Sequence, residues 1–193
     1  MLLGRAATPE VGRKLIALLQ WWEEYTRKHD ETLDNNAAPG NKSGGITTVL
    51  EKSLGAAAKG GTSDLVEVYR YAEPVIKQGF VFMDTPGYDP VSVTGQVAGG
   101  ANIVCFTTGR GSCFGCKPVP SIKLATNSPM YQKMAEDMDI NCGEVVDGTA
   151  SVEQMGERIF ELMLSVASGT KSKSEAYGYG EDEFAPWQLG ATF

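Results

Sequence analysis

The sequence predicts a mixed α/β fold, with a Rossmann-like, mostly parallel sheet flanked by helices. Short apolar runs alternate along the chain with segments of helical periodicity, an order typical of parallel sheets. The 23 glycines gather in clusters between apolar runs, which indicates tight loops rather than a repeat. The 193 residues, 42% hydrophobic and 21% charged, have a globular composition.

Helices are predicted where apolar residues recur every three or four positions. The first helix begins at Thr8 and Pro9, which suit the cap and first turn of a helix, and it ends in polar residues at His29. Ser151 and Gln154 have the spacing of a capping box at the start of the last helix. The helices expected in chain order are 8–30, 47–59, 90–98, 129–138 and 151–169.

Strands are predicted where apolar residues run between turn formers. Cys105 lies inside such a run, so its side chain is expected in the core. The turn formers of residues 34–45 predict an irregular loop. The strands expected in chain order are 65–71, 79–84, 102–107 and 119–125, with a short edge strand at 144–146.

We expect one domain over residues 1–193. It would consist of a leading helix over 1–33, an α/β core over 34–170 and a polar tail over 171–193. The tail carries scattered apolar residues that are expected to dock back onto the domain. These residues are Trp187, Leu189 and Phe193.

Charge is distributed unevenly along the chain. The 17 basic and 24 acidic residues give a net charge of −7, so a nucleic-acid-binding protein is not expected. Residues 90–135 nevertheless contain no acidic residue and four basic ones. This stretch suits an anionic ligand, and the alternative is a buried strand–loop–strand unit that is simply poor in charge.

Location is predicted from the apolar runs and the cysteines. No apolar run approaches the roughly 20 residues that span a bilayer, so no membrane association is expected. The N-terminus lacks the pattern of a secretory signal. Four cysteines in that context do not imply a disulfide framework, and a reduced, cytoplasmic location is expected.

The segment from Pro39 to Gly45 is the first candidate site. It is similar to a phosphate-binding P-loop, but Asn41 precedes Lys42 where that motif requires glycine, so we expect no nucleotide cofactor. Glycine-rich backbone with a lysine before a helix can still bind an anion through amide hydrogens and the helix dipole. The alternative is an ordinary helix-entry loop.

Asp84 is the second candidate. It ends a predicted strand and begins the turn Asp84-Thr85-Pro86-Gly87. Because ligands in open α/β sheets gather at the carboxyl ends of strands, Asp84 could contact a metal or a substrate. The alternative is an Asx turn that its own side chain closes.

Residues 107–118 form the segment richest in chemical groups. The guanidinium of Arg110 suits a carboxylate. Cys113 and Cys116 have a spacing that can hold zinc, an iron–sulfur cluster or a redox disulfide, and Cys142 could join them as a ligand. The alternative, which we favour over a cluster, is that these thiols are inert.

The only histidine limits the chemistry of the chain. His29 is expected to be a solvated residue at a helix end. Histidine triads and multi-histidine metal sites within the chain are therefore excluded. Proton transfer has to use a carboxylate, Lys, Tyr, Cys or a metal-bound water.

Several segments together resemble the altronate and galactarate dehydratase family of sugar-acid dehydratases. Their order and spacing make the resemblance specific, and it covers nearly the whole chain. The segments are 35–48, 51–55, 82–87, 106–111 and 137–143. Residues 113–117 and 183–188 resemble altronate dehydratases more closely than galactarate dehydratases. Ala37 and Ala38 depart from the family's pattern.

The resemblance implies that the chain is the C-terminal domain of a longer, metal-dependent hydro-lyase. Such an enzyme dehydrates a sugar acid to a 2-keto-3-deoxy acid, with D-altronate as the first candidate substrate and galactarate as the alternative. Another alternative is a non-catalytic anion-binding or assembly domain. The implied cofactor is a divalent metal, iron(II) or else manganese(II). The implied partners are the upstream domains of the parent chain and further copies in a homo-oligomer.

Residue roles follow from this resemblance and from side-chain chemistry. The catalytic candidates are Lys42, Asp84 and Arg110. The substrate-binding candidates are Asn36, Asn41, Gly44, Gly45, Thr107, Thr108, Gly109, Lys117 and Asn127. The metal-ligand candidates are Glu51, Cys113, Cys116 and Cys142.

Overall fold

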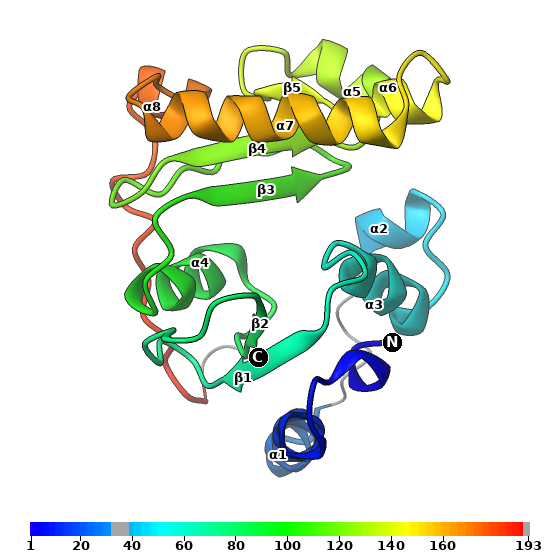
Figure 1. Cartoon of the computed structure of the whole chain (residues 1–193), viewed down its shortest axis with the longest axis vertical. Coiled ribbons are helices and arrows are strands. Elements are labelled where there is room, and N and C mark those ends of the chain that lie inside the picture. The colour runs from blue at the N-terminus through cyan, green and yellow to red at the C-terminus, as the bar shows by residue number, and fades with distance from the viewer. Residues whose placement is uncertain (32–38, 191–193) are drawn as a thin grey trace. The chain divides into compact units, whose positions relative to one another are not determined.

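The computed structural model describes residues 1–31 and 39–190 and contains two compact units. The first unit comprises Met1–Tyr88 with Trp187–Phe193, and the second comprises Asp89–Pro186. The boundary after Tyr88 therefore falls inside the predicted core of residues 34–170. Figure 1 shows the elements of the whole chain in order, and each unit is described by itself below.

The first unit combines helices with a pair of strands. Thr8 caps its long helix, because its Oγ1 accepts a hydrogen bond from the backbone N of Val11 at 3.3 Å. The elements are η1 (Leu3–Arg5), α1 (Pro9–Lys28), α2 (Pro39–Ser43), α3 (Val49–Ala58), β1 (Leu65–Tyr69) and β2 (Phe80–Met83).

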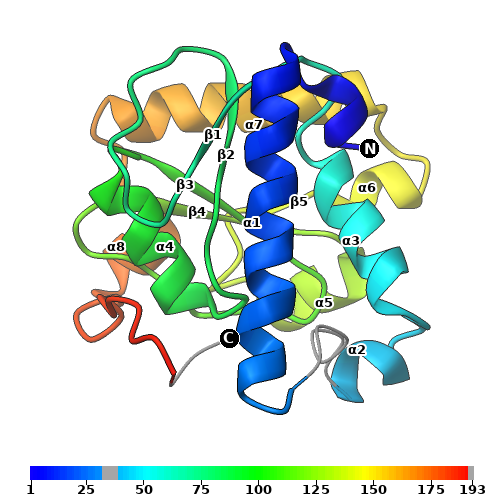
Figure 2. The same cartoon turned by 90° about the horizontal axis from the view of Figure 1, so that it is seen from below.

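The core of the first unit lies between α1 and the strands. The two strands are parallel, with Leu65 opposite Phe80. Val11 and Leu15 of α1 pack against Leu65 and Val68 of β1, and α1 runs along both strands (Figure 2). The apolar stripe of α1 thus buries one face of the pair.

The second unit is built around a parallel sheet in the order β3-β4-β5. Thr108 at the end of β3 lies opposite Ala125 at the end of β4. The elements are α4 (Asp89–Ala98), β3 (Val104–Thr108), β4 (Ser121–Ala125), α5 (Ser128–Lys133), β5 (Ile140–Asn141), α6 (Gly143–Val146), α7 (Val152–Ala167) and α8 (Lys173–Ala176).

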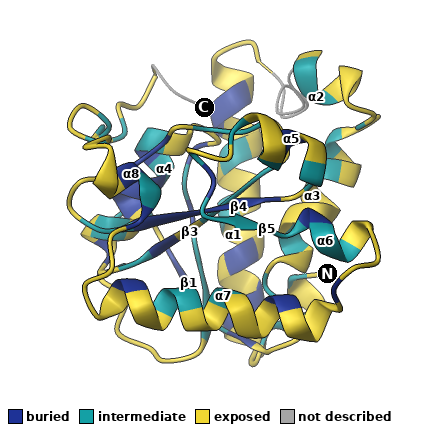
Figure 3. Ribbon diagram, turned by 90° about the horizontal axis from the view of Figure 1, so that it is seen from above, coloured by how far each residue is buried: buried dark blue, intermediate teal, exposed yellow. Residues whose placement is uncertain are grey.

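Helices cover both faces of this three-stranded sheet, as Figure 1 shows. Val166 of α7 packs with Ile122 and Leu124 of β4 on one face. On the other face Val93 of α4 packs with Val104 of β3. Most of α7 is exposed, with a few buried positions (Figure 3), as expected for an amphipathic helix on a sheet.

The predicted α/β class with parallel strands is confirmed, because every paired strand is parallel. The described strands divide between two hydrogen-bonded sheets, of two and three strands. The Rossmann-like character of the fold therefore stays a prediction. No helix among the described residues is long and apolar enough to cross a membrane.

Three local predictions were wrong. Residues 144–146 are helical, within α6, and the short strand is β5, just before them, because a short apolar run suits either state. Residues 39–43 of the expected loop form α2. Cys105 lies in β3 as predicted, but its side chain is exposed rather than in the core.

The tail docks as expected at Trp187. Its ring stacks on Trp22 of α1 with centroids 5.3 Å apart and packs edge-on against Tyr71. Leu189 is exposed, and Phe193 lies outside the described residues. Within the described part of the tail, Trp187 is the residue that makes this aromatic contact.

Candidate functional site

The carboxyl end of β3 carries the first group of predicted residues. The Oγ1 of Thr108 accepts hydrogen bonds from the backbone N of Arg110 at 3.3 Å and of Gly111 at 3.1 Å. Thr107 is half-buried, whereas Gly109 and Arg110 are exposed. The threonine hydroxyl therefore turns the chain directly after the strand and leaves the Arg110 guanidinium accessible to a ligand.

Asn127, after β4, connects two loops at the same edge of the sheet. Its Oδ1 accepts from the backbone N of Met130 at 2.9 Å, which caps α5. Its Nδ2 donates to the backbone O of Gly109 at 2.9 Å. The Asn127 amide thus positions the loop that carries Arg110. This structural role occupies both the oxygen and the nitrogen of the side chain that was predicted to bind substrate.

A further polar group lies at the end of β5. The Nδ2 of Asn141 donates to the Oγ of Ser128 at 2.9 Å, and that Oγ donates to the Oδ2 of Asp147 at 2.5 Å. We did not assign Asn141 or Ser128 a role from sequence. The available signal was the segment 137–143, which carries part of the family resemblance and places Asn141 at the carboxyl end of what proves to be a parallel strand.

The thiols of the second unit do not form a cluster. Cys113 is exposed, Cys116 is buried and Cys142 is half-buried. Burial raises the pKa of Cys116, with the charge of Glu183 adding to the effect, and burial likewise raises the pKa of Cys142. Both shifts disfavour the thiolate, the form of cysteine that is nucleophilic and binds metals.

Lys117 has a partner within its own unit. Its Nζ forms a salt bridge with Glu181, and both side chains are more than half exposed. An exposed pair of this kind contributes little to stability. The ammonium therefore remains a reasonable contact for an anionic ligand.

In the first unit, α2 carries Asn41 and Lys42, and Gly44 and Gly45 follow it. The Oδ1 of Asn41 accepts from the Nζ of Lys52 at 3.3 Å, while Lys42 is exposed. Gly45 has φ +103°, a conformation that favours glycine. Asn36, also predicted to bind substrate, lies outside the described residues.

Glu51 has a structural role at the start of α3. Its Oε2 accepts from the backbone N of Thr47 at 2.9 Å and from its Oγ1 at 2.8 Å. These bonds lower the pKa of Glu51. Thr48 completes the cap by accepting from the backbone N of Glu51 at 3.2 Å.

Asp84 is the one predicted catalytic residue that is buried. It follows β2 and is 7% exposed, and its Oδ1 accepts from the Nε1 of Trp22 at 2.7 Å. Burial raises the pKa of Asp84, and the Trp22 hydrogen bond partly opposes that shift. A carboxyl group in this environment is a suitable general base or acid. Sequence reasoning missed Trp22, because its contact is made 62 positions away.

The structure thus brings the predicted residues together in two separate groups. Thr107, Thr108, Gly109, Arg110 and Asn127 gather at the carboxyl edge of the β3-β4-β5 sheet, where the arrowheads of β3 and β4 point to one side (Figure 1). The second group is a single segment of the first unit that contains Asn41, Lys42, Gly44 and Gly45. Asp84 belongs to the same unit but lies about 40 positions later in the sequence. Within residues 1–31 and 39–190, no three His, Cys, Asp or Glu side chains gather in a way that could hold a metal ion.

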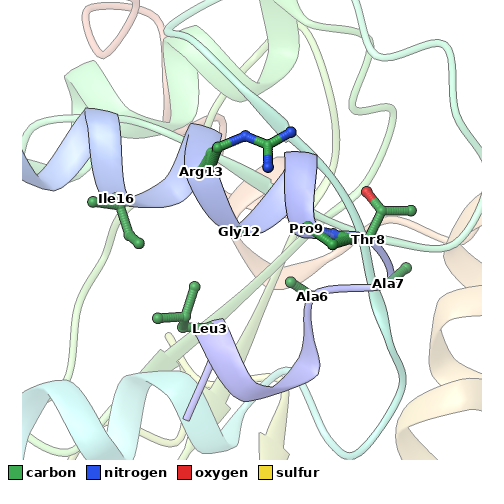
Figure 4. Close-up of a pocket in the computed structure, with 8 residues that line it drawn as sticks. All are labelled: Leu3, Ala6, Ala7, Thr8, Pro9, Gly12, Arg13 and Ile16. Atoms are coloured by element: carbon green, nitrogen blue, oxygen red, sulfur yellow. The ribbon is translucent and has the colours of Figure 1, made fainter.

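A pocket of about 410 Å³ lies between η1 and the first turns of α1 (Figure 4). Its lining is mainly apolar, with Arg13 as its charged residue. The lining residues are Leu3, Ala6, Ala7, Thr8, Pro9, Gly12, Arg13 and Ile16. None of the described residues that were predicted to be functional lines this pocket.

The sequence of the chain matches a family model over residues 1–192, and the model describes the C-terminal region of D-galactarate/altronate dehydratases. The chain belongs to this family. The resemblance found in the motifs is thereby confirmed, and the match extends over both units of the chain.

Curated relatives give the same result. The chain is 39% identical to galactarate dehydratase (L-threo-forming) of Escherichia coli over 89% of its length. It is 36% identical to altronate dehydratase of Bacillus subtilis over 100% of its length, and 34% identical to altronate dehydratase of Escherichia coli over 87%. The matches cover 33%, 38% and 34% of the relatives, so the chain spans about a third of their length.

Proposed function

We propose that the chain is the C-terminal domain of a hydro-lyase that dehydrates a sugar acid to a 2-keto-3-deoxy acid, with D-altronate as the first candidate substrate. Membership of the dehydratase family supports the reaction class. The observation that carries the proposal to this chain is the exposed Arg110 at the carboxyl edge of a parallel sheet, where ligands of α/β proteins bind.

Arg110 is proposed to bind the substrate carboxylate. A guanidinium can donate two parallel hydrogen bonds to a carboxylate, and such charge-assisted bonds are strong. Thr108 lies beside it in the loop, and a hydroxyl that accepts two backbone hydrogen bonds still has its proton to donate to a ligand oxygen. Sugar acids carry both a carboxylate and hydroxyls, so this pair suits them.

The dehydration itself requires an acid–base group. A proton beside the carboxylate is removed, and the neighbouring hydroxyl leaves with a proton as water. Asp84 is the proposed base, because burial raises the pKa of its carboxyl towards the range useful for proton transfer. Lys42 is kept as a candidate acid on the first unit.

A divalent metal, iron(II) or manganese(II), remains part of the proposal and would stabilise negative charge beside the carboxylate. The described residues do not fit such an ion. The Glu51 carboxylate is engaged by Thr47, and the described His, Cys, Asp and Glu side chains form no group of three that could hold a metal ion. The candidate ligands Glu51, Cys113, Cys116 and Cys142 are thus not brought together as one metal site.

Calorimetry with D-altronate and with galactarate tests the proposal on this chain. We expect D-altronate to bind more tightly, and Arg110→Ala to raise its Kd at least about tenfold, because a charged hydrogen bond is lost. Arg158→Ala is the control, since Arg158 is an exposed arginine of the same unit that pairs with Glu144 on its surface.

The other outcomes would change the proposal as follows. If galactarate bound more tightly, it would become the proposed substrate in place of D-altronate. Binding of either acid without turnover by a protein that carries the remaining domains and reduced iron would favour a non-catalytic anion-binding domain. An unchanged Kd in Arg110→Ala would remove Arg110 from the site.

A further inference from the structure

One peptide group in the β3–β4 loop (residues 109–120) is held from both sides by charged side chains. The carbonyl O of Phe114 accepts a hydrogen bond from the Nζ of Lys123 at 3.2 Å. The backbone N of the next residue, Gly115, donates to the Oε2 of Glu183 at 2.8 Å. Lys123 belongs to β4, whereas Glu183 belongs to the tail, 68 positions after Gly115.

Lys123 occupies an unusual place for a lysine, because it is completely buried. Burial lowers the pKa of its ammonium, and the charges of Asp139, Asp137, Cys113 and Glu183 oppose that effect. A buried ammonium is costly unless it is paired and hydrogen-bonded. Its position therefore indicates a role that an apolar residue in β4 could not perform, which is to hold the Phe114 carbonyl.

The tail is fitted closely against the same loop. The backbone N of Lys117 donates to the carbonyl O of Gly180 at 3.2 Å. A Cβ on Gly180 would lie only 2.8 Å from the carbonyl C of Gly115, so the two backbones pass in direct contact. The buried hydroxyl of Ser174 adds a hydrogen bond to the carbonyl O of Ser121, at the start of β4.

The other end of the loop is anchored at the candidate site. Thr108 and Asn127 hold its first residues through the bonds to Arg110 and Gly109. The ring of Phe114 stacks on Phe106 of β3 with centroids 5.3 Å apart. The loop is thus fixed at residues 109–111, where it leaves β3 with the exposed Arg110, and again at the Phe114–Gly115 peptide a few residues later.

We propose that Lys123 and Glu183 are positioning residues, which clamp the Phe114–Gly115 peptide and thereby hold Arg110 in place for an anionic substrate. The proposal rests on the proposed function of Arg110 as the carboxylate-binding group. It assigns the tail a part in substrate binding, although neither clamp residue touches the substrate.

The test uses the whole chain with Glu183→Ala, Glu183→Gln and the control Asp182→Asn. Asp182 is an exposed neighbour in the same tail segment, so its variant removes the same charge without touching Gly115. Hydrogen exchange reports on the amides of residues 109–117, and calorimetry reports the Kd of D-altronate and of galactarate. Circular dichroism with temperature confirms that each variant is folded.

We expect Glu183→Ala to speed exchange of the Gly115 amide at least about tenfold and to raise the Kd of the bound acid by a similar factor, because one charged hydrogen bond is lost. Glu183→Gln keeps a carbonyl oxygen for the Gly115 N–H and should restore most of both. Asp182→Asn should change neither. Lys123→Met, which removes the bond to Phe114, should speed exchange in the same loop.

Two results would overturn the proposal. Unchanged exchange at Gly115 in Glu183→Ala would show that the clamp does not order the loop. Faster exchange with an unchanged Kd would show that the clamp has no part in binding. If the unaltered chain binds neither acid, the proposed function fails. The exchange measurements would then still test whether Lys123 and Glu183 order the loop.

Discussion

At the scale of single residues, burial decides which ionisable groups of this chain have unusual properties. Glu67, Asp84 and Lys123 are all buried, yet their environments differ. Hydrogen-bond donors around Glu67 stabilise its carboxylate and lower its pKa. For Asp84 and Lys123 the largest effect on the pKa is burial away from water, which disfavours the charged form. The pKa shifts of the two carboxyl groups therefore have opposite signs.

The hydrogen bond from Trp22 should lower the pKa of the Asp84 carboxyl group. Its donor stabilises the carboxylate, so Trp22→Phe is expected to raise the pKa of Asp84 further above its ordinary value. Carbon-13 NMR titration of the carboxyl group measures this pKa directly. Trp21→Phe is the matched control, because the neighbouring ring is exposed. A fall in the Asp84 pKa in Trp22→Phe would contradict the assignment.

Glu67 should contribute stability that disappears in acid. Its side chain accepts from Lys14 at 2.8 Å and forms a second salt bridge with Lys77 at 3.0 Å. Together with the backbone N of Val68 these donors lower the pKa of Glu67 to about 2. A lowered folded-state pKa means that the contribution is complete above the ordinary value of 4.5 and is lost as the pH falls towards 2.

The Glu67→Gln variant tests this pH dependence of stability. The difference in free energy of unfolding between the original chain and the variant, measured with denaturant, should be largest at neutral pH and should shrink between pH 4.5 and 2. Glu10→Gln on the exposed surface of α1 is the control. A difference that does not vary over this pH window would contradict the shifted pKa.

At the scale of elements, loops between strand and helix position the candidate site. Thr108 turns the chain after β3, Asn127 caps α5 and Asn141 accepts from the backbone N of Gly143 at 3.0 Å before α6. Short polar side chains are suited to these turns because they bond to nearby backbone groups. The same residue types that suggested substrate binding thus also shape the edge of the sheet.

Gly143 should be the least replaceable glycine at this edge. A Cβ there would lie 2.2 Å from the backbone N of Ser128 and 2.5 Å from the carbonyl C of Asn127. Gly143→Ala is therefore expected to cost about 1–3 kcal/mol of stability and to disturb the Asn127 cap. Gly156→Ala, in the middle of α7 with no atom within 4 Å of the added Cβ, should instead gain about 0.5–1 kcal/mol. Thermal unfolding of both variants checks the contrast, and equal effects would refute it.

At the scale of the whole molecule, sequence predicted the succession of elements better than their assembly. The periodicity of α1 and α7 and the apolar runs of β1 to β4 are local properties, so their positions could be predicted. Residues 144–146, which lie in α6, were assigned to a strand because three residues are too few to show a period. The division of the strands between two sheets depends on long-range pairing, which no local pattern reports.

The candidate site shows the same limit. Thr108, Gly109, Arg110 and Asn127 were predicted from the family resemblance and from their side-chain chemistry, and the parallel sheet brings them to one edge. The roles of Glu51 as a cap and of Asn127 as a brace were missed. Trp22 and Glu183 were missed as well, because each contacts a residue more than 60 positions away.

The amino-acid sequence by itself determined the α/β class, the position of most elements and the family of the chain, because periodicity, capping residues and motifs are written in short segments. Only the tertiary structure decided that Lys123 is buried, that Asp84 lies against Trp22 and that the tail clamps the Phe114–Gly115 peptide. These properties depend on which distant segments exclude water from one another, and that exclusion exists only in the folded chain.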